Sequence, residues 1–554
     1  MSVVSAASSF AGIALAWVLW RVVLSLCTKS PLDNIPGPSR QSILTGNLRA
    51  LLNRNGWDFH NKIVQQYGGV VRIDGPMQFK VLYVSDPLAL HHLIVKDQPL
   101  YSRNPVDLLV GKLMFAAGLL SIGAGEQHRR QRKMLNPVFN VVHLRRLAPI
   151  FYAVAHKLRA GLTSKVTDGP AEVNILRWLS RCALELIGQG GLGYSFDHLT
   201  DSPNQPVHPY GDALLRLQPL LVHLSLAFRF ILPWGVNIGT ARFRRAVVDW
   251  VPWRAVHEFR DILDVMDRTT REIFEEKKRA MLSSSGSSEK DTGKDLVTIL
   301  MHQNAHADDE NRLPEEEVLG QVSLFLPSKP IVYSSTNNSF DFCKMSTFIF
   351  AATETTSTAL AQIVYLLAQN PEAAGEDIPY DTLMQLPYLD AVCRETLRLY
   401  PPAPVMLRTT LADTVLPLAT PIRGRDGAEL PALHIPRGTE FMLSVHAANR
   451  APSVWGPDAV EWKPARWLAP LPQSVVDTPA TGVYQHLLTF GGGPRSCIGF
   501  KFSQLEMKIV LAVLLPAFRV SLAPRPVIWN LGFVVHPSVE GTDDTQLPLV
   551  LSLV

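Results

Sequence analysis

Hydrophobic positions along this chain recur mostly at three- and four-residue intervals, which is typical of helices packed on a core. Helical patterns dominate from about residue 140 to about residue 400. Another follows residue 500, where Phe502, Leu505 and Ile509 share a face until Pro516 ends the pattern. Alternating positions predict a hairpin of two strands, Gly69–Asp74 and Phe79–Ser85, and further strands lie between about 405 and 470. The predicted fold class is mainly α with small β-sheets, an α+β arrangement.

The N-terminal segment differs from the rest because it is almost wholly apolar or small. From Ala6 to Cys27 only Arg21 is charged, and a helix of this length, at ~1.5 Å per residue, would cross a hydrocarbon core of ~30 Å. A cleavable signal peptide is the alternative, but no charged segment precedes the apolar run and no small-residue cleavage site follows it. We therefore expect residues 1–28 to form an N-terminal transmembrane helix.

The flanking residues give this helix an orientation. Lys29 and Arg40 follow the apolar run, so the positive-inside rule places the bulk of the chain in the cytosol. Residues 29–40, which include three prolines, predict a stiff linker. Residues 41–554 then form the folded domain. A single-pass protein of the endoplasmic reticulum membrane with a cytosolic catalytic domain is the expected location.

Composition narrows the classes of function. The chain has 554 residues, 47% of them hydrophobic, which supports a large core and excludes disorder. A formal charge of +4 is too small to indicate nucleic acid binding. The five cysteines are odd in number and scattered, which argues against a disulfide framework and for a reducing compartment.

One cysteine lies in a setting that favours chemistry. The stretch from Phe490 to Gly499 reads Phe-x-x-Gly-x-Arg-x-Cys-x-Gly, and the helical pattern begins directly after it. A helix N-terminus offers free N–H groups and a positive dipole end, which both favour a thiolate at Cys497. Arg495 offers a fork for a carboxylate. A structural cysteine in a glycine loop is the plain alternative, but five fixed positions of one template are hard to ascribe to chance.

At these residues the sequence resembles the haem-binding loop of the cytochrome P450 family, in its microsomal, membrane-anchored, fungal-like form. The resemblance implies the P450 fold, haem b as cofactor, and Cys497 as the metal ligand to the haem iron. Phe490 and Arg495 would then contact the haem. It also implies that Arg132 and His128, on a basic helix, bind a propionate, although the family usually has tryptophan where this chain has His128.

Three further motifs match family positions. Arg408 matches a residue that reaches a propionate. Glu395 and Arg398 share a helical face, and the family pairs them with a second arginine, here Arg466, in a structural network.

Glu354 and Thr355 match the family's oxygen-activation motif. Cleaving dioxygen heterolytically consumes two protons, and a hydroxyl beside an ionisable group can relay them. A threonine that bonds back to the preceding turn is the plain alternative. The family usually has glycine where this chain has Ala352.

Two segments depart from the family pattern. Residues 322–344 contain Pro327, Pro330 and a polar run, and interrupt a helix that reads continuously when Gln321 is joined to Met345. We interpret this segment as an unspliced intron translated in frame, with a genuine surface insertion as the alternative. Its residues are expected to be exposed and without long regular structure. Residues 371–379 are shorter than the family norm, which is a second anomaly.

The resemblance implies a monooxygenase of secondary metabolism that inserts one oxygen atom into an apolar small molecule. Electrons would come from NADPH through a cytochrome P450 reductase, for which the basic helix Arg129–Lys133 is a candidate dock. Met406, Leu407, the segment around Val535–Asp543 and the region after Pro105 are candidate pocket walls. A haem-thiolate isomerase or dehydratase, and an inactive haem-binding product of a faulty gene model, are the alternatives. The apolar stretch Leu214–Trp234 is interpreted either as a core helix or as a membrane-dipping rim.

Overall fold

The computed structural model describes residues 30–42, 45–75, 79–115, 118–123, 125–201, 208–284, 295, 298–299, 339–370, 380–384, 386–479, 481–484 and 486–554. The chain divides into two compact units. The sheet unit comprises Met1–Asn104, Val405–Ala459 and Pro472–Arg495, and the helical unit comprises Pro105–Pro404, Val460–Leu471 and Ser496–Val554. Each unit is described by itself.

The sheet unit is built on a five-stranded sheet with the order β1-β2-β8-β5-β3. Strands β2 and β8 are parallel, and the other pairs are antiparallel. The predicted hairpin is confirmed, because β1 pairs with β2 in a register that joins Val70 to Val84. The strands of this unit are β1 (Val70–Asp74), β2 (Lys80–Val84), β3 (Tyr101–Ser102), β5 (Val405–Thr410), β6 (Thr414–Arg423), β7 (Glu429–Ile435) and β8 (Glu440–Ser444).

Short helices surround the sheet, and one apolar core joins strands and helices. The α4 helix, for example, begins where the Asp86 carboxylate caps the N–H of Ala89 at 2.9 Å. The helices are η1 (Pro31–Asn34), α2 (Leu48–Leu51), α3 (Trp57–Tyr67), α4 (Pro87–His91), η3 (His92–Lys96), η4 (Gln98–Leu100), α19 (Val445–Ala448), α20 (Pro452–Trp455), α21 (Gln473–Asp477) and η9 (Gly493–Arg495).

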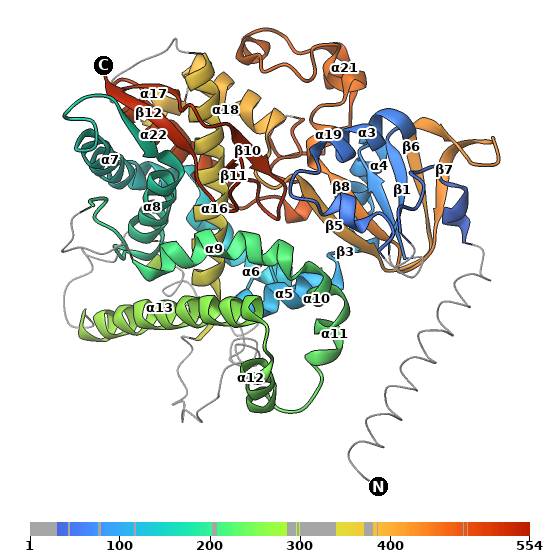
Figure 1. The fold of residues 1–554 in the computed structure, drawn as a ribbon, viewed down its shortest axis with the longest axis horizontal. Helices are drawn as coiled ribbons and strands as arrows, with labels where there is room; N and C mark the ends of the chain where they lie inside the picture. Colours follow the sequence, from blue (N-terminus) through green and yellow to red (C-terminus); the bar gives the residue numbers. More distant parts are fainter. Residues whose placement is uncertain are drawn as a thin grey trace. The chain divides into compact units, whose positions relative to one another are not determined.

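The helical unit contains the long helices. Figure 1 shows α16 in the middle of this unit, and it packs on α8, α9 and α13. The helices are α5 (Pro105–Phe115), α6 (Glu126–Leu135), η5 (Asn136–Phe139), α7 (Val141–Thr163), α8 (Ile175–Ile187), η6 (Gly188–Leu192), α9 (Pro209–His223), α10 (Ser225–Phe230), α11 (Leu232–Gly235), α12 (Ala241–Trp250), α13 (Arg254–Ser284), α16 (Ser339–Gln369), α17 (Tyr380–Met384), α18 (Pro387–Leu399), η8 (Pro464–Leu468) and α22 (Phe500–Leu514).

Small sheets complete the helical unit. Strands β4 (Ala171–Asn174), β12 (Pro548–Leu553) and β9 (Phe518–Leu522) form one antiparallel sheet, and β10 (Val527–Asn530) pairs with β11 (His536–Val539) in a second. The core lies where α8, α9, α13 and α16 meet, and Ile349 and Phe350 of α16 are buried in it. The predicted helix-rich α+β class is therefore confirmed for the described residues.

The predicted location as a single-pass protein of the endoplasmic reticulum membrane is corrected here. Within the described ranges, no helix has both the length and the apolar content that crossing a bilayer requires. The longest are α13 and α16, of 31 residues each. Charged residues occur along the whole of α13, and a run of hydroxyls with Glu354 interrupts the apolar sequence of α16. Residues 1–28, to which the transmembrane helix is assigned, lie outside the described residues.

Helix α16 begins earlier than the sequence predicts. We expected helix from Met345, but the structure has helix from Ser339, so the last six residues of the expected irregular segment are helical. Residues 339–344 contain neither proline nor glycine, so nothing in the backbone stops the helix from extending. Residues 322–338 and 371–379, where the other expectations for the anomalous segments fall, lie outside the described residues.

The core-helix interpretation of the apolar stretch Leu214–Trp234 is confirmed for its first part. Its first part is α9, where Leu214 and Leu217 are buried in the core. Its second part is α10 and α11, where Ile231 is 61% exposed and Trp234 is 67% exposed. A single core helix is therefore wrong for the second part.

Candidate active site

The predicted cysteine stands directly before a helix, as expected. Helix α22 begins at Phe500 with Gly499 as its N-cap. Cys497 is free and exposed, whereas the other cysteines that the structure describes, Cys182 and Cys393, are buried. Although solvent reaches the sulfur, the surrounding atoms raise the pKa of Cys497 by desolvation, and the Gly499 N–H and the Arg132 charge lower it. An accessible thiol with a cation and an N–H beside it is suited to metal ligation.

The residues before the cysteine belong to the sheet unit and follow a path that only glycine permits. Gly491 and Gly493 have φ values of +64° and +59°, in the left-handed region. A Cβ on Gly492 would lie 1.5 Å from the carbonyl oxygen of Thr481. The glycine signal in the sequence is thus a real backbone requirement.

Three predicted haem-contacting residues also lie in the sheet unit. The ring of Phe490 packs edge-on against Tyr484, with centroids 5.5 Å apart. Burial, together with the charge of Arg103, lowers the pKa of Arg495 to about 10. Such a guanidinium gains from an anionic partner. Arg408 on β5 donates to the carbonyl oxygen of Leu407 at 2.9 Å. Their contacts with a haem stay predictions.

Helix α6 brings Arg132 to the cysteine loop. The guanidinium donates to the carbonyl oxygen of Ser496 and, at 3.2 Å, to its hydroxyl. Burial lowers the pKa of Arg132, and the neighbouring Cys497 raises it. His128, one turn earlier, is buried. The structure thus unites Arg132 with the loop, and the propionate contacts of both residues stay predictions.

The predicted carboxylate–guanidinium network is confirmed. Arg398 binds both oxygens of Glu395 at 2.8 Å, and Arg466 binds one of them at 3.3 Å. The indole N–H of Trp467 donates to the second oxygen at 3.0 Å. Desolvation raises the pKa of Glu395, but these partners outweigh it and hold the pKa below the ordinary value. This fully partnered acid fixes α18 to η8.

Glu354 and Thr355 lie on α16 in contrasting environments. The hydroxyl of Thr355 donates to the carbonyl oxygen of Ala351 at 2.7 Å, which is the plain back-bond considered above. Glu354 is 6% exposed, and desolvation raises its pKa to about 8 against a small opposing effect of Gln218. Within the described part of the chain, its Oε1 has no hydrogen-bond partner. The carboxyl therefore holds a proton at neutral pH and can donate it.

A small hollow of about 10 Å³, the space for about one water molecule, adjoins this carboxyl within the helical unit. It is lined by Arg177, Ser180 and Arg181 from α8, by Gly211, Asp212 and Leu215 from α9, and by Thr353 and Glu354 from α16. Charged residues contribute to this lining, but the atoms that face the hollow are apolar.

Two buried polar residues were missed by sequence reasoning. Gln218 of α9 is 2% exposed and lies beside Glu354. Glu506 of α22 is fully buried near Thr356, and burial holds its pKa well above the ordinary value. Both lie close to other polar residues of their helices, such as Arg216 and Lys508, so the sequence alone gives no signal that identifies them.

The chain is similar along most of its length to proteins of one family. Residues 36–327 and 343–538 match the family model "Cytochrome P450". The chain is 44% identical to "Cytochrome P450 monooxygenase 91" of Postia placenta, over 97% of each chain. It is 37% identical to "Ganoderic acid synthetase CYP5150L8" of Ganoderma lucidum, over 97% of this chain and 96% of that one. The chain belongs to the cytochrome P450 family, and it is a P450 monooxygenase.

A solved structure shows the same fold. A crystal structure of a cytochrome P450, CYP102L1, superposes with a TM-score of 0.66 at 21% identity, and covers 94% of this chain and 100% of its own. The family match leaves out residues 328–342, which fall inside the segment 322–344. The intron interpretation of that segment stays a prediction.

Members of this family bind haem b, and the residues of this chain fit that group. The free thiol of Cys497 is exposed beside a guanidinium and an N–H group. In the loop before it, side chains are excluded at Gly491, Gly492 and Gly493 by conformation or by contact. These are the properties that a thiolate ligand and a close-fitting loop require.

Proposed function

We propose that this P450 inserts one atom of dioxygen into an apolar small molecule, with electrons from NADPH delivered by a flavoprotein reductase. The observation that carries the proposal is the buried carboxyl of Glu354, with its raised pKa and its unpaired oxygen, next to Thr355. Reducing dioxygen to one inserted atom and one water consumes two electrons and two protons, and this carboxyl is a proton donor in the right protonation state. An isomerase or dehydratase has no such need.

Each residue then has a defined task. Cys497 would supply the thiolate, Arg132, Arg408 and Arg495 would pair with the propionates, and His128 would donate a hydrogen bond to one of them. When bound, the haem supplies the thiolate-ligated iron that activates dioxygen.

Proton delivery is the task of two residues on α16. Glu354 releases a proton and is reprotonated before the next turnover. The hydroxyl of Thr355 turns away from the carbonyl oxygen of Ala351 to pass the proton on. Because a hydroxyl accepts one proton as it donates another, the residue ends unchanged.

The experiment supplies the protein with haem, a P450 reductase and NADPH, and offers a panel of apolar compounds. Consumption of NADPH and dioxygen in step with product, and one labelled oxygen atom in that product when labelled dioxygen is used, supports the proposal. Product formed without consumption of dioxygen would instead indicate an isomerase or dehydratase.

The reductase is proposed to dock on α6. The side chain of Arg129 is 80% exposed, and it pairs with Glu126 of its own helix, at 3.0 Å, in an ion pair open to solvent. Arg130 and Lys133 add to the positive charge of this helix. Surface charges of this kind steer association more than they strengthen it. Arg129→Glu should therefore slow electron transfer most at low salt.

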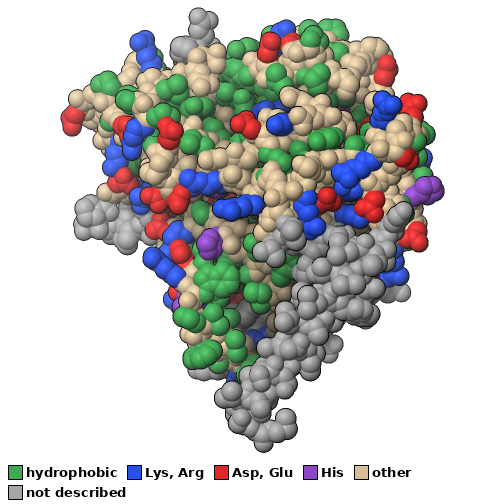
Figure 2. All heavy atoms as spheres, turned by 45° about the vertical axis from the view of Figure 1, so that its right-hand side comes forward, with side chains coloured by type: hydrophobic (Ala, Val, Ile, Leu, Met, Phe, Trp, Pro, Cys, Tyr) green, Lys and Arg blue, Asp and Glu red, His purple; other side chains and the backbone are tan. Residues whose placement is uncertain are grey.

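A lipid surface is the second proposed partner. Figure 2 shows hydrophobic side chains gathered over the region where α11 and α12 lie in Figure 1. The exposed apolar residues from α10 to the start of α13 are Leu226, Phe230, Ile231, Trp234, Ile238, Phe243, Val247, Trp250 and Trp253. Aromatic and aliphatic side chains with arginines between them are typical of helices that lie in a membrane interface.

This proposal is tested by flotation with phosphatidylcholine vesicles. The double variant Trp234→Ser/Trp250→Ser should bind at least severalfold more weakly than the wild type. Val460→Ser is the matched control, because Val460 is 62% exposed outside this surface. Equal binding of all three proteins would refute the proposal.

A further inference from the structure

Two buried polar side chains that are neighbours in the helical unit, Gln218 and Glu354, each have an atom without a partner among the described residues. Among the described residues, the amide Nε2 of Gln218 and the carboxyl Oε1 of Glu354 both have no hydrogen-bond partner. The two side chains are nevertheless neighbours, because Gln218 is the group that lowers the pKa of Glu354 against the effect of burial. One atom is a donor and the other an acceptor. A hydrogen bond between the two atoms would give each of them a partner. Buried polar groups rarely lack a partner without a functional reason.

The amide oxygen of Gln218 is held by a different hydrogen bond. Its Oε1 accepts from the N–H of Val534 at 3.3 Å, in the turn that joins β10 to β11. The same turn is tied to α16, because the hydroxyl of Thr358 donates to the carbonyl oxygen of Val535 at 3.2 Å. Thr358 lies one turn after Glu354 on the same face of α16. Gln218 thus lies between Glu354 and the β10–β11 turn, and this turn also contacts α16, the helix that carries Glu354.

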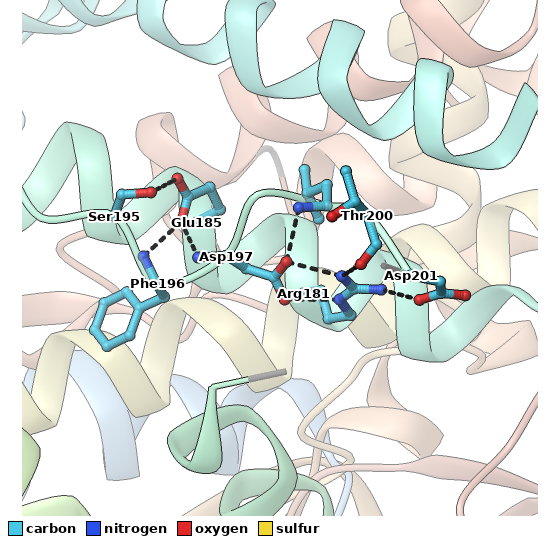
Figure 3. Close-up of polar contacts among 8 residues, drawn as sticks. Arg181, Glu185, Ser195, Phe196, Asp197, Thr200 and Asp201 are labelled. Carbon is cyan, nitrogen blue, oxygen red and sulfur yellow. Dashed lines mark hydrogen bonds and ion pairs between the residues drawn. The ribbon is translucent and has the colours of Figure 1, made fainter. Parts of the chain in front are cut away.

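A second buried glutamate provides a comparison. Glu185 of α8 is also fully buried, and Figure 3 shows its carboxylate turned toward the backbone of the next loop. It accepts from the Ser195 hydroxyl at 2.6 Å and from the N–H groups of Phe196 and Asp197 at 2.7 and 2.8 Å. The amide of Gln189 also donates to it. The carboxylate of Glu185 is therefore completely paired, whereas Glu354 and the buried Glu506 of α22 both have carboxyl oxygens without a partner among the described residues.

We propose that Gln218 is a positioning residue: its amide holds the carboxyl of Glu354 in the orientation for proton delivery and couples that orientation to the β10–β11 turn. This inference rests on the proposed role of Glu354. A displacement of the turn moves the amide oxygen through Val534, and the amide nitrogen then moves relative to the carboxyl. The charged residues that line the hollow together with Glu354 are Arg177 and Arg181 from α8 and Asp212 from α9.

The test follows the protonated carboxyl of Glu354 in the haem-loaded protein by its infrared C=O stretch, assigned by its absence in Glu354→Gln. Gln218→Met keeps the shape of the side chain and removes the amide. We expect the titration midpoint of Glu354 to rise by about 1 unit, because a donor to the carboxylate form is lost. The amide of Val534 should exchange with deuterium faster, and a severalfold larger share of NADPH should appear as free peroxide.

Gln189→Met is the matched control, because it removes an equivalent amide from the fully paired Glu185. It should leave the Glu354 band, the exchange at Val534 and the peroxide share unchanged. If Gln218→Met does not fold, Gln218→Glu replaces it, and a second acid beside Glu354 should raise the midpoint further.

The outcomes separate the two claims. If Glu354→Gln leaves the peroxide share unchanged, the proposed role of Glu354 fails. If Glu354→Gln raises it but Gln218→Met matches the wild type in midpoint and peroxide share, only the inference on Gln218 is wrong.

Discussion

Replacing Glu354 by glutamine should remove a pH-dependent loss of stability. The carboxyl has a pKa of 4.5 when unperturbed and about 8 in the folded chain, where burial disfavours its charge. Because the folded pKa is the higher one, the stabilisation is complete below about pH 4.5 and is lost as the pH rises to about 8. A difference of about 3.5 units at ~1.4 kcal/mol each corresponds to ~5 kcal/mol of unfolding free energy. The neutral amide of Glu354→Gln has no such dependence.

The assay is urea-induced unfolding of the haem-loaded wild type and of Glu354→Gln at several values between about pH 5 and about pH 9. Other titrating groups, such as Glu506, contribute to both proteins and cancel in the difference. We expect the variant to gain about 4 kcal/mol on the wild type between about pH 5 and about pH 8. A difference between the two proteins that does not change with pH would refute the assignment of a buried, neutral Glu354.

Three other predictions concern α16, the Glu395 network and the anomalous segment. Thr355→Ala should raise the peroxide share severalfold while substrate binding, measured by the shift of the haem spectrum, changes little; unchanged coupling would exclude this hydroxyl. Glu395→Ala leaves Arg398 buried without its partner. The free energy of unfolding, measured by urea titration, should therefore fall by about 3–5 kcal/mol. A loss under ~1 kcal/mol would contradict the structural role of Glu395. Transcripts should join the Gln321 codon to the Met345 codon, and deleting Val322–Lys344 from the protein should not lower haem incorporation. If all transcripts retain this segment and its deletion lowers haem incorporation, the segment belongs to the enzyme.

Sequence patterns were sufficient where the interacting residues are close in the chain or belong to a recognisable motif. The helix after Cys497 and the β1–β2 hairpin follow from periodicity over a few residues. The network of Glu395 joins residues 71 positions apart, and only the family resemblance made that pairing predictable.

Long-range polar contacts without a motif could not be predicted. Gln218 and Val534 are 316 positions apart, and nothing in either segment indicates that the fold brings them together beside Glu354. The end of helix α9 near Leu224 was not predicted for a different reason. Leu214–Trp234 is apolar throughout, so composition does not reveal that the chain turns at Leu224 and exposes the second half.

The start of α16 was also mispredicted, because the local sequence indicated a loop where the structure has a helix. Polar residues near Ser339 predicted a loop, but a helix anchored in the core by Ile349 and Phe350 extends through them. Tertiary packing overrides weak propensity at helix ends.

The most direct test of the central claim is the carbon monoxide difference spectrum of the reduced, haem-loaded protein and of Cys497→Ser. We expect the band of a thiolate-ligated haem in the wild type and in Cys182→Ser, because Cys182 is buried on α8, and its loss in Cys497→Ser. A thiolate-type band that survives in Cys497→Ser would contradict the assignment of the loop and, with it, the account of this active site.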